Sequence, residues 1–121
     1  MSGVLAIILV AGGHFHGKYV EAISEVMIEK NQQIKSLLQN EDFENAKKLT
    51  DEMRDYLDSK RITLSIIADH MMIENIEKNI AQMRSYTIDE QRFDSLSNCD
   101  VLQVLLIRMK KAFRLSIENI F

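Results

Sequence analysis

Two clusters in this sequence combine residue types that could do chemistry, and the more complete one is Asp69, His70 and Glu74. The four-residue step from His70 to Glu74 places both side chains on one face of a helix. An imidazole beside two carboxylates suits acid–base catalysis or metal binding, although the second histidine of the His-Glu-x-x-His arrangement is missing. A structural alternative stays open, in which Asp69 caps a helix start and His70 lies at a corner of a helical bundle.

The second cluster is His14 and His16, two residues apart beside glycines. Imidazole nitrogens bind metals, but a metal site needs more ligands than these two histidines supply. The sequence contains no phosphate-binding loop, nucleophile elbow or paired-carboxylate site. We therefore expect a protein that is not an enzyme and uses no cofactor. A metal-binding enzyme or sensor built on Asp69, His70 and Glu74 is the rival hypothesis.

A basic cluster near the C-terminus consists of Arg108, Lys110, Lys111 and Arg114. On a helix, three of these side chains share a face, which suits contact with anionic lipid or with an acidic protein partner. The alternative is a solvated face, and the acidic stretch 41–58 offers a complement within the chain. The cluster is small and the net charge is -3, so we expect no binding to nucleic acid.

Helices are the elements predicted to position these residues. The chain has no proline, and all four glycines lie in its first 17 residues. Strand-rich folds need tight turns that usually recruit glycine or proline, so the body is predicted to be all helix. The 121 residues suffice for one domain with a modest core. The single cysteine, Cys99, excludes an internal disulfide bond.

Apolar residues recur at helical spacing in four segments. They predict helices over about 18–39, from 41 to a break at 69–70, from that break to about 86, and over about 88–119. The predicted stripe of the first helix comprises Val20, Ile23, Met27, Ile34 and Leu38. Asn40 is the predicted N-cap of the second helix and Asp69 that of the third, and a second helix that continues through 69 and 70 is the alternative. Thr87 and Glu90 fit a capping box that starts the last helix. The predicted seam of the second helix comprises Phe43, Ala46, Met53, Leu57, Leu64, Ile67 and Met71. The predicted fold is an all-α antiparallel helical bundle, or two stacked helical hairpins, of about four helices.

The chain opens on a short apolar segment made of Val4, Leu5, Ala6, Ile7, Ile8, Leu9 and Val10. It is shorter than the about 20 residues of a membrane-spanning helix, and no basic residue precedes it. Removing seven aliphatic side chains from water is nevertheless worth on the order of 10 kcal/mol. We therefore divide the chain into an apolar segment with a glycine hinge, 1–17, and a helical domain, 18–121. The apolar segment either inserts into a membrane or packs against itself or a partner.

Two stretches, SIIADHMMIENIEKNIAQMRSY and LSIENIF, resemble an uncharacterised family, a domain of unknown function. The similarity covers 42–121 and also includes DFENA. The family consists of small helical bacterial proteins from Gram-positive anaerobes and spore-formers. The resemblance implies a single-pass protein with a basic start, a full hydrophobic helix and a helical body. This chain has a shorter apolar segment, and it carries Tyr56 where members often have a tryptophan.

These observations together predict a non-enzymatic, membrane-associated helical interaction or structural module at the bacterial envelope. Its location would be the bacterial cell membrane, single-pass or peripheral, with the body outside the cytoplasm and docked to an unidentified protein partner. If the apolar segment does not insert, the protein would be cytoplasmic. A soluble homo-oligomer that packs through Val4–Val10 is a further alternative.

Overall fold

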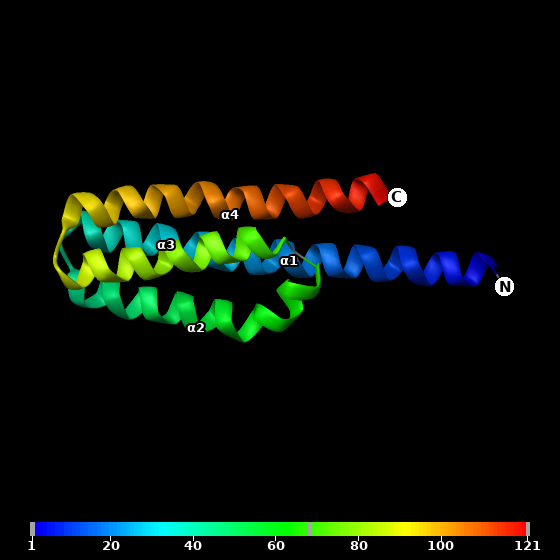
Figure 1. Ribbon diagram of the computed structural model, residues 1–121, viewed down its shortest axis with the longest axis horizontal. Helices are drawn as coiled ribbons and strands as arrows, with labels where there is room; N and C mark the ends of the chain where they lie inside the picture. Colours follow the sequence, from blue (N-terminus) through cyan, green and yellow to red (C-terminus); the bar gives the residue numbers. More distant parts are fainter. Residues whose placement is uncertain (1, 68, 121) are drawn as a thin grey trace.

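The computed structural model describes the backbone of residues 2–67 and 69–120 and the side chains of residues 18–65 and 69–112. Four helices follow one another along the chain, as Figure 1 shows: α1 (Ser2–Gln39), α2 (Phe43–Ile67), α3 (His70–Ile88) and α4 (Arg92–Ile120). The described backbone contains no strand. The all-α prediction is therefore confirmed, and α1 begins earlier than the predicted Lys18.

Each helix packs against two neighbours. α1 contacts α2 and α4, and α3 contacts the same two helices. Neighbouring helices run in opposite directions (Figure 1), so the fold is an antiparallel four-helix bundle. The short turns 40–42 and 89–91 lie together at one end of the bundle, which we call the turn end. We call the opposite end, where residues 68 and 69 join α2 to α3, the α2–α3 end.

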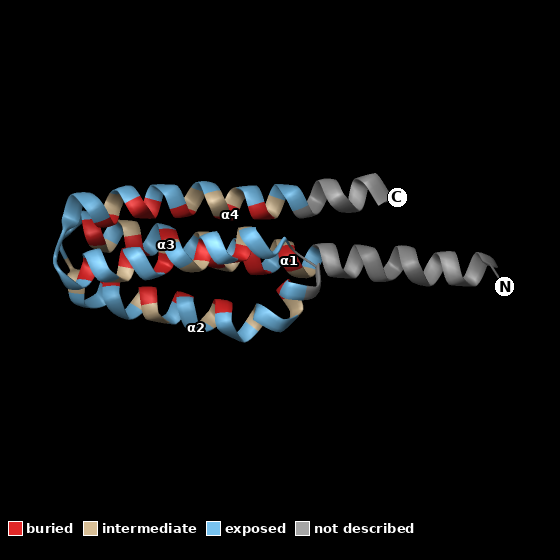
Figure 2. Ribbon diagram, viewed as in Figure 1, coloured by how far each residue is buried: buried red, intermediate tan, exposed pale blue. Residues whose placement is uncertain are grey.

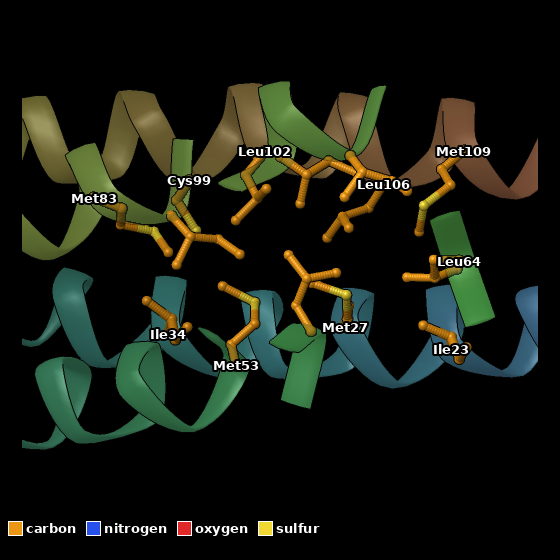
Figure 3. Close-up of a cluster of buried hydrophobic side chains, with 14 of the residues drawn as sticks. Ile23, Met27, Ile34, Met53, Leu64, Met83, Cys99, Leu102, Leu106 and Met109 are labelled. Atoms are coloured by element: carbon orange, nitrogen blue, oxygen red, sulfur yellow. The ribbon is translucent and has the colours of Figure 1, made fainter. Parts of the chain in front are cut away.

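One hydrophobic core runs along the bundle axis (Figure 2). Its side chains come from all four helices and meet in the middle (Figure 3). The buried apolar residues are Val20, Ile23, Met27, Ile34, Leu38, Ala46, Met53, Leu57, Leu64, Ile73, Ile76, Ile80, Met83, Cys99, Leu102, Leu106 and Met109. Over the described side chains, which do not include that of Ile67, the predicted stripes form the core, because each helix buries the face on which its apolar residues recur.

Met71, which the sequence placed on the α2 seam, belongs to a different helix. α2 ends at Ile67, and Met71 is the second residue of α3, where its side chain is exposed. The Asp69 N-cap explains the break, since its carboxylate accepts a hydrogen bond from the Met71 N–H at 3.0 Å. The predicted cap at Asp69 is confirmed.

The predicted N-cap at Asn40 is wrong, because Asp42 occupies that position. The Asp42 carboxylate accepts a hydrogen bond from the Asn45 N–H at 3.3 Å, and the Asp42 carbonyl accepts one from the Ala46 N–H at 3.0 Å. Glu41, with φ 58°, belongs to the end of α1 instead. A Schellman turn ends α1 there and delays the start of α2 by two residues.

The predicted capping box of Thr87 and Glu90 is also wrong. α3 continues through Thr87 to Ile88, and α4 begins only at Arg92. The Thr87 side chain is buried, and its hydroxyl donates to the Met83 carbonyl at 2.7 Å. Because the buried hydroxyl already has a hydrogen-bond partner in the preceding turn of α3, Thr87 is accommodated inside this helix and does not cap the next one.

Candidate functional site

The structure gives Asp69, His70 and Glu74 different surroundings. Asp69 has extended backbone angles, φ -63° and ψ 125°, and directs a carboxylate oxygen at the backbone of its own helix. His70 and Glu74 are exposed on the first turns of α3. Asp69 is therefore the N-cap of α3, which is the structural role that the sequence left open for it.

His70 and Glu74 do share a hollow of about 300 Å³ between α2 and α3. An ion pair between Arg61 of α2 and Glu77 of α3 lies in the same hollow. Among the residues whose side chains are described, no group of three or more His, Cys, Asp or Glu is placed to hold a metal ion. His14 and His16 lie outside the described side chains.

The basic cluster divides between two faces of α4. Lys110 turns toward α1, where its ammonium lies 3.0 Å from the Glu25 carboxylate. Arg108 and Lys111 are exposed, and neither forms an ion pair with any residue of the described part. Arg114 lies outside the described side chains. The described partner of the cluster is therefore Glu25, and not a residue of the acidic stretch 41–58.

An exposed face of α4, which sequence reasoning missed, continues from Arg108 and Lys111 toward the turn end. It runs in steps of three or four residues through Phe93, Ser97, Val101, Val104, Arg108 and Lys111, which we call the outer face of α4. The exposed fractions are 81% for Phe93, 51% for Val101 and 48% for Val104. In the sequence, Leu102 and Leu106 are four residues apart and share one helix face, whereas Val101 and Val104 fall on another face. Two apolar residues outside the buried stripe could have indicated this exposed face.

A smaller exposed apolar group lies at the α2–α3 end. Ile62 of α2 is 79% exposed and Met71 of α3 is 71% exposed. Ile62 also lines the hollow that contains His70 and Glu74. Sequence reasoning placed Met71 in the core and left Ile62 unassigned.

Asn31 of α1 and Cys99 of α4 form a polar contact inside the core. The Asn31 amide donates to the Cys99 carbonyl at 2.9 Å and to the Gln103 side chain at 3.0 Å. The Cys99 thiol in turn donates to the Asn31 side-chain oxygen at 3.1 Å. Burial, with a smaller contribution from the Asp100 charge, raises the pKa of Cys99 to about 12. The thiol therefore stays protonated and serves packing rather than nucleophilic chemistry.

Lys60 of α2 joins α1 to α2 through two aromatic rings. Its ammonium lies 5.6 Å from the ring centre of Tyr19 and 5.7 Å from that of Tyr56. At this distance the ring faces attract the cation, which explains how a lysine is tolerated on the apolar seam of α2. Partial burial raises the pKa of Tyr56.

The apolar segment Val4–Val10 lies outside the described side chains. Within the part of the chain that is described, no helix is apolar over a sufficient length to cross a membrane.

Comparison with known proteins identifies one family. A family model described as a domain of unknown function (DUF4363) matches residues 14–120. No curated protein and no solved structure matches the chain.

Proposed function

This chain belongs to the DUF4363 family, a domain of unknown function, and we propose that it is a non-enzymatic interaction module at the bacterial envelope. In this proposal Val4–Val10 holds the protein at the cell membrane. The four-helix bundle stands outside the cytoplasm as a rigid support and presents the outer face of α4 to a protein partner.

The outer face of α4 is the observation that carries the proposal. Apolar side chains buried on the opposite side of the helix hold α4 in the bundle, so Phe93, Val101 and Val104 are not needed for the core. Arg108 and Lys111 follow these apolar residues on the same face, and neither cation forms an ion pair with a residue of the described part. Such a stripe fits an amphipathic helix whose apolar seam covers the two valines and whose acidic residues meet the two cations.

The tether is supported by the composition of the first residues. Val4–Val10 contains seven aliphatic residues in succession, and their transfer out of water is favourable by on the order of 10 kcal/mol. The segment is short for a bilayer by itself. A membrane nevertheless provides an apolar environment that seven consecutive aliphatic side chains do not find in water.

Alkaline carbonate extraction of membranes from cells that express the full chain tests the tether. We expect the protein to remain in the extracted membrane, and a variant with Ile7→Asp and Ile8→Asp to be released. A wild-type protein that is soluble before extraction would contradict the tether. If that soluble protein were an oligomer that dissociates on deletion of Val4–Val10, packing between copies would replace membrane insertion.

Site-specific photo-crosslinking in the same cells tests the docking surface. A photoreactive residue replaces Val104 in one variant and the exposed Lys47 of α2 in a control. We expect a discrete protein adduct at position 104 only, and its loss when Arg108→Glu and Lys111→Glu are added. An adduct that forms equally at position 47, or that survives both charge reversals, would contradict docking through this face.

A further inference from the structure

We infer that the α2–α3 end of the bundle is a lipid-contacting surface, on which Ile62 and Met71 enter the headgroup region of the bilayer. This inference rests on the proposed function, since Val4–Val10 has to hold the protein at the membrane. It adds a second contact between protein and lipid, made by the folded bundle itself.

The first argument is the exposure of two apolar side chains. Ile62 and Met71 are each more than two-thirds exposed, and they come from the two helices that meet at this end. Met71 is the second residue of α3, directly after the Asp69 cap. Large apolar side chains near a helix end are suited to insertion at the boundary between headgroups and acyl chains.

The second argument is the direction in which the chain leaves the bundle. α1 and α2 run in opposite directions from the turn 40–42 (Figure 1), and α2 runs from Phe43 to Ile67. Lys18 lies about as far back along α1 from this turn as Ile67 lies forward along α2, so Lys18 is near the level of the α2–α3 end. Only seven residues, 11–17, separate Val10 from Lys18. Even fully extended they reach about 25 Å. A membrane that holds Val4–Val10 therefore lies close to the α2–α3 end and far from the turn end.

The third argument is the difference in charge between the two ends. Lys18 is exposed near the level of the α2–α3 end, and a cation there suits lipid phosphates. The turn end carries exposed carboxylates on both turns and on the first turn of α4, including Glu41, Glu90 and Asp94. The α2–α3 end also carries two exposed carboxylates, those of Asp69 and Glu74. That of Asp69 accepts a hydrogen bond from the Met71 N–H, and Glu74 lies one turn farther along α3.

Tryptophan fluorescence tests the inference, because the chain contains no tryptophan. Met71→Trp places a single probe at the α2–α3 end. Phe93→Trp is its matched control, since Phe93 is also the second residue of its helix, is similarly exposed and lies at the turn end. Ile62→Trp provides a second probe at the α2–α3 end. Each full-length variant is reconstituted into phosphatidylcholine vesicles with one quarter phosphatidylglycerol, with and without brominated acyl chains.

We expect the indoles at positions 71 and 62 to emit at shorter wavelength on vesicles and to lose fluorescence severalfold to the brominated lipid. The indole at position 93 should keep the emission of a water-exposed tryptophan. Flotation of the same vesicles in a density gradient reports the tether independently. A chain that floats while the probes at positions 71 and 62 remain unquenched would overturn this inference and leave the tether intact. A chain that does not float would overturn both, and quenching at position 93 alone would overturn the inference by reversing the orientation.

Discussion

At the scale of single residues, burial decides the chemistry of the one cysteine. The sulfur of Cys99 sits in the core among apolar side chains (Figure 3). Its thiol donates a hydrogen bond to the Asn31 side-chain oxygen, and the Asn31 amide nitrogen donates one to the Cys99 carbonyl. In the described part, no buried side-chain nitrogen or oxygen lacks a hydrogen-bond partner. A pKa raised to about 12 follows from the cost of placing a thiolate in that environment. The residue therefore contributes a pH-dependent term to stability.

The protonated thiol of Cys99 predicts a loss of stability at alkaline pH. An unfolded chain releases the thiol proton near pH 9, the ordinary pKa, whereas the folded chain retains it until about pH 12. The contribution is thus complete below pH 9 and declines as the pH rises, by about 1 kcal/mol at pH 10. Urea unfolding from pH 8 to pH 10 measures it against Cys99→Ala. An identical pH dependence of the two proteins would contradict the burial of the thiol.

At the scale of elements, the two turns of the turn end share one design. The Asp42 N–H donates to the Leu37 carbonyl at 2.9 Å and the Glu41 N–H to that of Leu38 at 3.1 Å, which is a Schellman motif. The turn 89–91 repeats both bonds. Each motif places a glutamate, with φ 58° or 56°, where glycine is usual. Helix-capping rules located these turns within a few residues but misjudged which residue caps the helix that follows each turn.

Replacing these glutamates by glycine should stabilise the protein. The left-handed conformation costs a residue with a Cβ about 1 kcal/mol or more, and glycine avoids this cost. We expect Glu41→Gly and Glu90→Gly each to raise the free energy of unfolding by up to about 1 kcal/mol, after the entropy of glycine in the unfolded chain is subtracted. Asp89→Gly is the control, because Asp89 has φ -81°. Chemical denaturation measures all three, and a gain at position 89 as large as at position 90 would contradict the explanation by backbone strain.

The Asp69 cap offers a test at the start of α3. Asp69→Ala removes the acceptor of the Met71 N–H and should destabilise the protein by about 1 kcal/mol. Asp69→Asn keeps an acceptor and should retain most of the stability. Urea denaturation of these two variants beside the wild-type protein provides the measurement. If the asparagine variant lost as much as the alanine variant, the charge of Asp69, and not its hydrogen bond, would stabilise α3.

At the scale of the whole molecule, one side of α4 stabilises the bundle and the opposite side is the proposed docking surface. The inner side of α4 buries Leu102, Leu106 and Met109 against the other helices, while the outer face exposes Val101 and Val104. The residues of α4 that stabilise the fold are therefore different from the exposed apolar residues that a partner could contact. The fold can therefore be preserved while the proposed docking surface is changed.

Neighbouring residues of α4 provide the test of this separation. Leu102→Ala leaves a cavity in the core and should cost about 3 kcal/mol of unfolding free energy. Val101→Ala should cost less than about 0.5 kcal/mol, because its side chain is half exposed. Thermal and urea denaturation of both variants check these values. A cost at Val101 close to that at Leu102 would show that the outer face is packed, and would remove the basis for docking there.

The sequence by itself determined the helices and the faces they bury. Absence of proline and confinement of glycine to the first 17 residues excluded a strand-rich body, and the spacing of Ile23, Met27 and Ile34 located the core. These properties depend on local backbone preference and on the helical period of about 3.6 residues, which a sequence displays directly. The cap at Asp69 was predictable for the same reason, because its hydrogen bond spans two residues.

Only the tertiary structure decided which polar residues are paired and which apolar residues are left over. Lys110 meets Glu25, and Asn31 meets Cys99, across separations of 85 and 68 residues. No local pattern specifies such partners, since they depend on how α1 and α4 align. The same packing covers Thr87 and leaves Val104 exposed. Burial is a property of the assembled bundle, and it alone distinguishes a core residue from a surface that is free to bind.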